Sequence, residues 1–297
     1  MSWKLYRWVW RLEAPLHIGI TPAGLLNRTR LYIPARNIWA ALTEELARRS
    51  FSASSASFPD YAGTGQQVQE AMRFSYLYPA EQVNGKWQAW LPQYEQNGDE
   101  SGLSWCREDG GKSLPDRQFR RRILITCPST AIDPSADSAA EATLRELECI
   151  SPWWRQVNGQ DSAHSVAMVG YVLCKDDQSY QQLCQNVMAI DEIFVGGDVR
   201  YGLGHLRRYD QPNNEEQHLF GNQVNLQPPD PIVQTQRVLA HTLPKGNVSF
   251  IGRWTCIGGW DMVKGSMMSA HSAWEPGSST ETMHGFAIQK EGWWQRV

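Results

Sequence analysis

Four glycines, three arginines, a tyrosine and a histidine fall within the fourteen residues Val195-Gly196-Gly197-Asp198-Val199-Arg200-Tyr201-Gly202-Leu203-Gly204-His205-Leu206-Arg207-Arg208. Glycine adopts positive φ readily and allows another chain to approach its backbone amides closely. Arginine supplies forked donors that suit phosphate groups. This composition favours a loop that holds a charged polymer over one that closes a small-molecule pocket. A tight turn that needs its glycines only for packing is the alternative, and both stay open.

Within this loop, the backbone amides of residues 196–204 are expected near phosphates, with arginine side chains adding charge-assisted bonds. Tyr201 and His205 are candidates for stacking on a base. Asp198 is expected to cap the loop's own amides rather than to bind magnesium. No Gly-Lys-Ser/Thr follows, so the loop is not a Walker motif.

The segments before the loop show clear periodicity. Residues 4–12 alternate between two faces, which predicts a strand, and 36–49 have helical spacing. Residues 166–173 are nearly all apolar, which is typical of a central strand. Residues 177–193 carry one apolar stripe, with Asp177 as the expected helix cap.

The rest of the chain reads as strands and connections. Residues 74–94 predict a hairpin around the Asn84-Gly85 turn, and 121–127 predict a strand. Polar, Gly-rich or Ser-rich composition predicts loops or connections at three places, which are 50–70, 97–117 and 210–236. The last 60 or so residues are strand-and-loop-like.

The order of elements predicts an α+β protein. Strand, helix, strands, strand, helix, loop and strand match a ferredoxin-like (RRM-like) βαββαβ domain with inserted loops. We assign that domain to residues 1–210. Residues 211–297 are then a linker and a C-terminal β-rich extension that packs on it.

Composition sets further limits. The chain has 297 residues, is 41% hydrophobic and carries a net charge of −3, so its overall charge does not indicate a nucleic-acid binder. Arginine is nevertheless clustered, and solvated faces remain the alternative to a local basic surface. Besides those in the glycine-rich loop, the clustered arginines are Arg28, Arg30 and Arg36, and Arg117, Arg120, Arg121 and Arg122.

Several site classes are not expected. The six cysteines form no C-x-x-C pair and the seven histidines are far apart, so we expect no metal, no cofactor and no disulfide framework. No apolar run reaches the length of a membrane span and the N-terminus lacks a signal-peptide core, which predicts a soluble, cytoplasmic protein. Most of the fourteen tryptophans, with Trp260 and Trp274 among them, are expected in the core or at interfaces.

Taken in order, these motifs resemble the RAMP superfamily, whose members build CRISPR effector complexes and process guide RNA. Pro15-Leu16-His17-Ile18-Gly19, followed by Ile33-Pro34 opening an amphipathic helix, resembles its N-terminal signature, and the loop from Gly196 to Gly204 resembles its glycine-rich loop. One departure is Pro34-Ala35-Arg36-Asn37, where a Pro-Gly-Ser-type turn is usual; Arg36 is as consistent with a phosphate contact as with a surface position.

Shorter segments are similar to particular subunit types. The mid-domain segment of type III members resembles Ala131-Ile132-Asp133, Ala139-Ala140-Glu141 and Glu146-Leu147-Glu148. Near the end of the chain, three stretches resemble a segment of the subunits that cap the 5′ handle of the guide RNA. They are Gly259-Trp260-Asp261, Lys264 and Glu275-Pro276-Gly277-Ser278.

The resemblance implies a non-catalytic guide-RNA-binding subunit of a type III CRISPR ribonucleoprotein in antiviral defence, holding the 5′ handle. The implied partners are guide RNA and other effector subunits, including the large signalling subunit, with no membrane. The candidate RNA-binding residues are His17, Arg28, Arg30, Arg36, Arg120, Arg121, Gly196, Gly197, Arg200, Tyr201, Gly202, Gly204, His205 and Arg207.

Three alternatives stay open. The chain is a backbone subunit that cleaves target RNA through an acidic loop residue, for which Asp60, Asp99 and Asp109 are the loop aspartates. Or it is a metal-independent guide-processing endoribonuclease with His17 as general acid or base, aided by His205 and Arg200. Or it is a scaffold that contacts protein only, with its tryptophans at interfaces.

Overall fold

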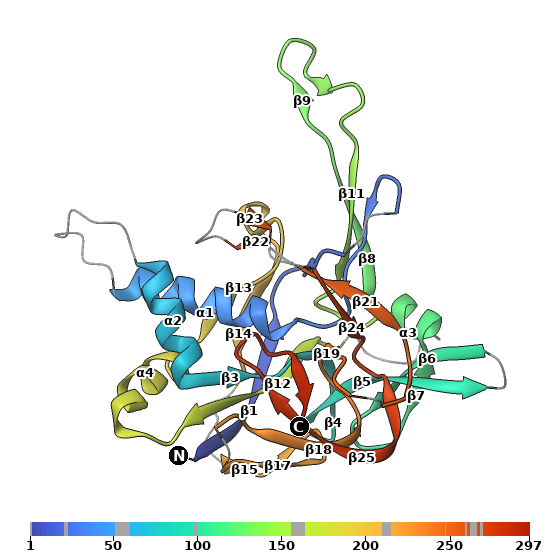
Figure 1. The fold of residues 1–297 in the computed structure, drawn as a ribbon. Helices are drawn as coiled ribbons and strands as arrows, with labels where there is room; N and C mark the ends of the chain where they lie inside the picture. The colour runs from blue at the N-terminus through green and yellow to red at the C-terminus, as the bar shows by residue number, and fades with distance from the viewer. Residues whose placement is uncertain are drawn as a thin grey trace.

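The structure, a computed structural model, is a mixed α+β fold dominated by sheets, with four α-helices among the described residues (Figure 1). The described residues are 2–20, 23–50, 60–97, 100–155, 164–209, 215–227, 229–246, 248–258, 260–261, 266–267 and 270–297. None of the helices in these ranges has the length and apolar character that a membrane span requires.

The first sheet has ten strands in the order β13-β14-β1-β12-β4-β5-β6-β7, with β15 on β1 and β3 on β12. At its centre β1 pairs antiparallel with β12, from Trp3↔Lys175 to Arg11↔Ala167. The strands predicted at 4–12 and 166–173 are therefore confirmed, the second as a central strand. The bounds are β1 Trp3–Leu12, β3 Met72–Phe74, β4 Tyr78–Val83, β5 Lys86–Asn97, β6 Glu100–Arg107, β7 Ser113–Pro115, β12 Ala167–Lys175, β13 Glu192–Phe194, β14 His205–Arg208 and β15 Glu215–Glu216.

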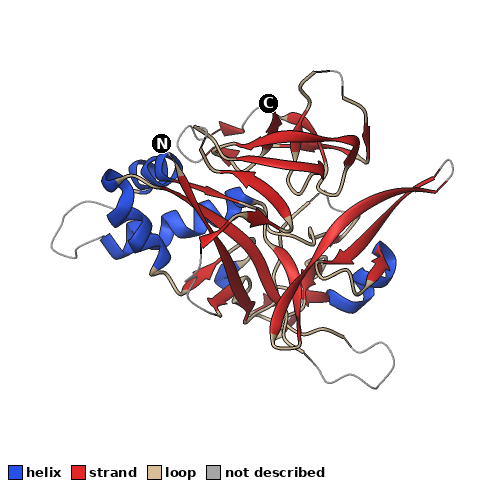
Figure 2. Ribbon diagram, turned by 90° about the horizontal axis from the view of Figure 1, so that it is seen from below, coloured by secondary structure: helices blue, strands red, loops and turns tan. Residues whose placement is uncertain are grey.

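Three helices gather at one end of this sheet, while the fourth lies at the opposite end (Figures 1 and 2). The first three are α1 Ala35–Ser50, α2 Tyr61–Ala71 and α4 Gln178–Met188, and the fourth is α3 Asp116–Ile123. Helix α1 confirms the prediction at 36–49, because Ile38, Leu42 and Leu46 are buried on one stripe. The Asp177 side chain caps α4 by accepting from the Ser179 amide, as expected.

The second sheet is built from the C-terminal part of the chain. Nine strands follow the order β16-β17-β18-β25-β26-β19-β24-β21, with β20 on β25. Their bounds are β16 His218–Leu219, β17 Asn222–Asn225, β18 Ile232–Arg237, β19 Thr242–Leu243, β20 Phe250–Ile251, β21 Trp254–Ile257, β24 His271–Trp274, β25 Ser279–Ile288 and β26 Trp294–Arg296. A small pair, β22 Trp260–Asp261 and β23 Ser266–Met267, stands apart. The β-rich expectation for this region is confirmed.

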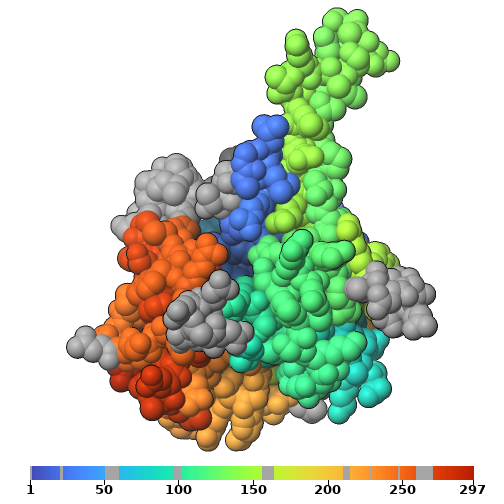
Figure 3. Space-filling model, turned by 90° about the vertical axis from the view of Figure 1, so that its right-hand side faces the viewer, coloured from blue at the N-terminus to red at the C-terminus, as the bar shows by residue number. Residues whose placement is uncertain are grey.

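A long hairpin projects from the body of the molecule (Figures 1 and 3). We call residues 124–150 the arm. Its strands are β8 Leu124–Ser129 and β11 Arg145–Ile150, with the short β9 Ile132–Asp133 and β10 Ser138–Ala139 towards the tip. Near its base, β2 Leu26–Asn27 pairs parallel with β11.

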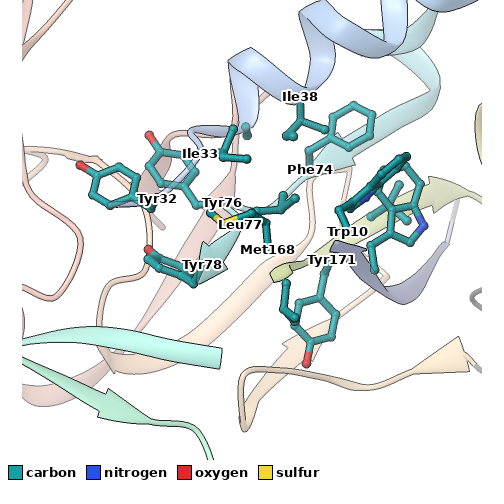
Figure 4. Close-up of a cluster of buried hydrophobic side chains, with 14 of the residues drawn as sticks. Trp10, Tyr32, Ile33, Ile38, Phe74, Tyr76, Leu77, Tyr78, Met168 and Tyr171 are labelled. Atoms are coloured by element: carbon teal, nitrogen blue, oxygen red, sulfur yellow. The ribbon is translucent and has the colours of Figure 1, made fainter. Parts of the chain in front are cut away.

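Aromatic residues fill the core between these elements, and Figure 4 shows part of it, with Trp10, Phe74 and Tyr76 among its members. The fully buried tryptophans are Trp8, Trp10, Trp90, Trp105 and Trp294. Trp274 stacks on Phe250 with ring centroids 5.1 Å apart. The prediction that tryptophan serves the core is confirmed at these positions, whereas the side chain of Trp260 lies outside the described part.

Five expectations for local structure are wrong in part. Residues 61–71 form α2 rather than a loop, because Val68 and Ala71 bury one face and Asp60 caps its start. Residues 97–117 include β6 and β7, because β5 is long enough to offer β6 an edge to pair with. The part of the 50–70 segment at 51–59 lies outside the described residues.

The other three concern the segments 121–127, 210–236 and 177–193. Residues 121–123 complete α3, where Phe119 and Ile123 turn inward, so the strand predicted at 121–127 begins at Leu124. Within 210–236 the structure forms β15 to β18, which pair with β1 or with one another instead of forming a plain connection. The predicted helix at 177–193 ends at Met188 and is followed by β13.

Candidate nucleic-acid interface

The glycine-rich loop joins β13 to β14 and is pinned to the segment that follows β1. The Val195 amide donates to the Gly204 carbonyl at 2.9 Å, and the Gly204 amide donates to the Pro15 carbonyl at 2.8 Å. The Gly197 amide donates to the His17 carbonyl at 2.9 Å. The Tyr201 and Gly202 amides donate within the loop, to the carbonyls of Asp198 and Val199. Four of the amides expected to face phosphate therefore bind carbonyls of the protein itself.

Two glycines of the loop are required by packing. Gly196 has φ of 93°, and a Cβ there would lie 2.3 Å from the His17 carbonyl oxygen. Gly204 has φ of 74°, with the Val195 carbonyl oxygen 1.9 Å from such a Cβ. Real side chains do not approach so closely, so these positions support the packing alternative. Gly202 differs, because its φ of 85° is positive but nothing lies within 4 Å.

The exposed part of the loop is the short 3-10 turn at Val199–Tyr201 and the residues beside it. Arg200 is exposed, and Tyr201 has 78% of its surface accessible. Asp198, at φ of 57°, pairs with Arg145 at the start of β11. This ion pair links the loop to the arm.

Beyond the turn, three predicted side chains already contact other groups of the protein. His205 lies 4.7 Å from Phe194 in a stacked arrangement, and its Nε2 is 2.7 Å from Glu192. Arg207 donates to the same carboxylate at 3.0 Å, and these hydrogen bonds lower the pKa of Glu192. Arg208 is buried, with its guanidinium over the ring of Trp10.

His17 is also held in place. It is buried, and its Nδ1 donates to the Glu148 carbonyl at 2.8 Å. Its ring lies against the positions a Cβ would take on Gly19 and Gly197. The residue therefore joins the arm, the glycine-rich loop and the segment after β1.

Arg28 and Arg30 lie on a strand-like segment that folds back on itself. The Ile20 amide donates to the Arg28 carbonyl at 3.0 Å, and the Arg30 amide donates to the Ile18 carbonyl at 2.8 Å. Thr29 between them is fully buried and receives a hydrogen bond from Ile18. Because successive side chains point to opposite faces, both arginines face away from that buried side.

The glycine-rich loop and the start of α1 share a hollow of about 350 Å³, which we call the helix hollow. Gly196 and Gly197 line it from one side, and Arg36 and Asn37 from the first turn of α1. Arg30 also lines it. Four of the predicted positions thus line one hollow, and they are Arg30, Arg36, Gly196 and Gly197. His17 is adjacent to it, because its carbonyl accepts from the Gly197 amide.

An adjoining hollow of about 470 Å³, which we call the sheet hollow, lies between the two large sheets. Ile20 and residues 28–32 form its middle, with α3 and β6 on one side and the C-terminal sheet on the other; Figure 3 shows this order in blue, green and orange. Arg30 lines both hollows, so they are neighbours. The charged residues of the sheet hollow are Arg28, Arg30, Arg120, Arg253, Asp116 and Glu275.

The sheet hollow carries an excess of positive charge. Arg120 Nε donates to Asp116 at 2.7 Å, while Arg28 makes no ion pair with any residue in the described ranges. Arg30 donates to the Tyr32 hydroxyl at 3.2 Å. Burial raises the pKa of Tyr32 to about 12, so this hydroxyl stays neutral. Four guanidiniums face two carboxylates, which favours an anionic ligand.

A buried histidine, His241, contacts the tyrosines next to the sheet hollow. His241 Nδ1 is 2.7 Å from the Tyr76 hydroxyl, and its Nε2 is 3.3 Å from that of Tyr32. Burial, aided by the charge of Arg30, lowers the pKa of His241 to about 3. The ring is therefore neutral and orients Tyr32 under Arg30 without adding charge.

Of the arginines predicted at 120–122, only one lines a hollow. Arg120 lines the sheet hollow, whereas Arg121 is exposed and lines neither hollow. Arg122 packs between Trp90 and Trp154 and pairs with Glu81, so it has a structural role. Sequence reasoning missed Arg253, because an isolated arginine in a strand-rich segment gives no signal before the two sheets meet.

No family model and no curated protein matches this sequence. Similar chains occur among solved structures. A chain of the cryo-EM structure of the type III-B Cmr-beta bound to cognate target RNA gives a TM-score of 0.54 at 12% identity, covering 92% of this chain and 86% of that chain. A chain of the complex bound to target RNA and AMPPnP gives 0.52 at 12% identity, covering 92% and 85%. At this identity the likeness shows the fold alone.

Proposed function

We propose that this chain is a non-catalytic RNA-binding subunit of a type III CRISPR ribonucleoprotein, of RAMP type, that grips the 5′ handle of the guide RNA. Its partners are then single-stranded guide RNA and other effector subunits, including the large signalling subunit. The fold supports this proposal, because the similar chains belong to structures described as type III-B Cmr-beta bound to target RNA.

One observation carries the proposal. The glycine-rich loop, the first turn of α1 and residues 18–20 and 28–32 line one pair of adjoining hollows, and five arginines line them. Arginine suits phosphate through paired N–H donors, and its planar group also stacks on bases. A chain of net charge −3 that gathers arginines here has a local surface suited to a polyanion.

We also propose that the central strands form a ferredoxin-like unit. Strands β14, β1, β12 and β3 are neighbours in that order, α1 lies on the connection from β1 towards β3, and α4 on that from β12 towards β14. This arrangement matches a βαββαβ unit with insertions. Residues 1–210 would then be the RNA-gripping domain, and 211–297 the extension that closes the sheet hollow.

The contacts of the candidate catalytic groups favour structural roles. His17 is buried and bonded to Glu148, and a general base needs direct reach to the 2′-hydroxyl. Asp60 caps α2, and Asp109 is bound by Arg107 and the Gly111 amide. Asp99 lies outside the described residues. These contacts support gripping over cleavage.

The test is a binding assay on the purified full chain. A guide RNA with its 5′ handle and a scrambled RNA of equal length are titrated by fluorescence anisotropy at two salt concentrations, and the products are run on a denaturing gel. We expect handle-selective binding that weakens steeply with salt, without cleavage. Cleavage of the repeat would support the processing enzyme, cleavage of an added target would support the backbone subunit, and no binding would support the protein-only scaffold.

A further inference from the structure

The sheet hollow contains one carboxylate that phosphate binding does not explain. Glu275 lines it, and the Tyr94 hydroxyl donates to Glu275 Oε2 at 2.6 Å. Burial and this hydrogen bond raise the pKa of Tyr94, so the hydroxyl keeps its proton and continues to donate. Oε1 of Glu275 has no hydrogen-bond partner within the described residues, and it is available to a donor in the hollow.

The turn that carries Glu275 is held firmly. Ser278 donates to the Glu275 carbonyl through its amide at 3.1 Å and through Oγ at 2.7 Å. Gly277, at φ of 96°, lies so close to Pro92 that a Cβ would meet its carbonyl carbon at 2.9 Å. The Tyr94 amide donates to the Gly277 carbonyl at 2.9 Å. These contacts fix the turn against β5, so the carboxylate is pre-positioned.

Across the hollow, an arginine lacks an acceptor. Arg120 Nε is bound to Asp116, but its Nη1 is buried with no hydrogen-bond partner among the described residues. Nη1 has almost no accessible surface, whereas 27% of the Arg120 side-chain surface is accessible, so a ligand in the hollow reaches the guanidinium through its other atoms. Asp116 accepts from Trp105 Nε1 at 2.9 Å as well, which leaves it less free to bind a ligand than Glu275.

The rest of the lining suits a flat, partly apolar group. Leu103, Pro92 and Pro276 lie beside the buried rings of Tyr32 and Tyr94. A volume of about 470 Å³ lies within the range of small-molecule sites and admits one nucleotide. The hollow therefore combines an apolar wall, free guanidinium donors and one fixed carboxylate acceptor.

We propose that the sheet hollow receives a single base turned out of the bound RNA strand and that Glu275 makes it selective for guanine. Guanine has two adjacent donors, N1–H and N2–H, for one carboxylate. It also has two adjacent acceptors, O6 and N7, which pair with arginine. Uracil and adenine lack both features, because neither base has two adjacent donor positions or an adjacent pair of acceptors like O6 and N7. The inference rests on the proposed function, because the base must belong to an RNA that the neighbouring arginines hold.

The experiment measures base preference rather than total binding. A short oligouridine and the same strand with one central guanosine or inosine are titrated against the full chain by fluorescence anisotropy. We expect the guanosine strand to bind about tenfold more tightly than oligouridine. Inosine, which lacks the N2 amino group, should lose part of that gain.

The key variant is Glu275→Gln, which keeps the side-chain size and an oxygen for Tyr94 but places an amide where the carboxylate acceptor was. The matched control is Glu281→Gln, which removes an equal charge from an exposed position on β25 outside the hollow. We expect Glu275→Gln to abolish the guanosine preference while oligouridine binding is retained. The Glu281→Gln control should retain both the guanosine preference and the binding of oligouridine.

The other outcomes are distinct. Equal binding of guanosine and uridine strands by the unmodified chain would overturn the guanine site and leave the proposed function standing. An equal change in affinity for all strands in both variants would show that Glu275 acts through charge alone, and would also overturn the site. Failure of every strand to bind, while the handle-bearing guide RNA still binds, would overturn the guanine site alone. Failure of the handle-bearing guide RNA as well would overturn the proposed function, and the inference with it.

Discussion

A Cβ atom on Gly204 would lie 1.9 Å from the carbonyl oxygen of Val195, the residue at the other end of the glycine-rich loop. The two residues are joined by a hydrogen bond of 2.9 Å from the Val195 amide to the Gly204 carbonyl. The loop is therefore closed at its neck, and the closure depends on the absence of a side chain. The same closure brings Gly196 and Gly197 to the helix hollow.

We expect Gly204→Ala to destabilise the protein by more than about 2 kcal/mol, because it combines a positive φ with a backbone clash. Gly202→Ala is the matched control, since its φ of 85° is also positive but its surroundings are open. It should cost only about 1 kcal/mol. Urea unfolding of both variants measures the difference, and equal losses would contradict the role of the neck.

We expect Arg28→Ala to weaken RNA binding and to reduce the slope of log K against log salt by about 0.7, the value for one phosphate contact on a single strand. Arg28 lines the sheet hollow and makes no ion pair within the described ranges, so its removal leaves no carboxylate unpaired. Arg48→Ala is the control, because Arg48 is exposed at the end of α1. An unchanged salt slope in Arg28→Ala would argue against a phosphate contact.

We expect the free energy of unfolding to decrease as the pH falls, because His241 has a lowered pKa in the folded protein. Its pKa is lowered to about 3 in the folded protein from an ordinary value of 6.5, so the unfolded chain binds a proton between these values and the folded protein does not. The contribution of neutral His241 to the free energy of unfolding is complete above pH 6.5. It is lost as the pH falls to about 3, at about 1.4 kcal/mol per pH unit.

The measurement is urea unfolding between pH 7 and pH 5, where few carboxylates titrate. His241→Gln should flatten the dependence of the unfolding free energy on pH. His271→Gln, at an exposed histidine, should leave it in place. An unaltered slope in His241→Gln would show that other groups cause the acid sensitivity.

We expect Glu81→Gln to destabilise the protein by about 3 kcal/mol, because it leaves the mostly buried Arg122 guanidinium without its counter-charge and leaves Arg107 with Asp109 alone. Glu81 is buried and accepts from Arg107 at 2.7 Å and from Arg122 at 3.2 Å. Glu141→Gln, at an exposed position on the arm, is the control and should change the unfolding midpoint little. Similar midpoints for the two variants would refute this assignment.

Local signals in the sequence were sufficient for the central strands, for α1 and α4, and for the turn at Asn84-Gly85. Alternation and the 3.6-residue period report burial directly, and Asn84 and Gly85 both adopt positive φ as that turn requires. The sequence failed at α2 and at β6 and β7. Their polar composition resembles a loop, and they become regular only because α1 and β5 offer them a face and an edge.

For the site, the sequence by itself determined which residue types are present. These are the glycines that allow the glycine-rich loop to close and the clustered arginines. Only the tertiary structure decided which of them share a surface. Arg207 and His205 are taken up by Glu192, while Arg28, Arg30, Arg120 and Arg253 gather around Glu275. The physical reason is that charge pairing and access depend on contacts between the two sheets, and those contacts join residues more than two hundred positions apart in the chain.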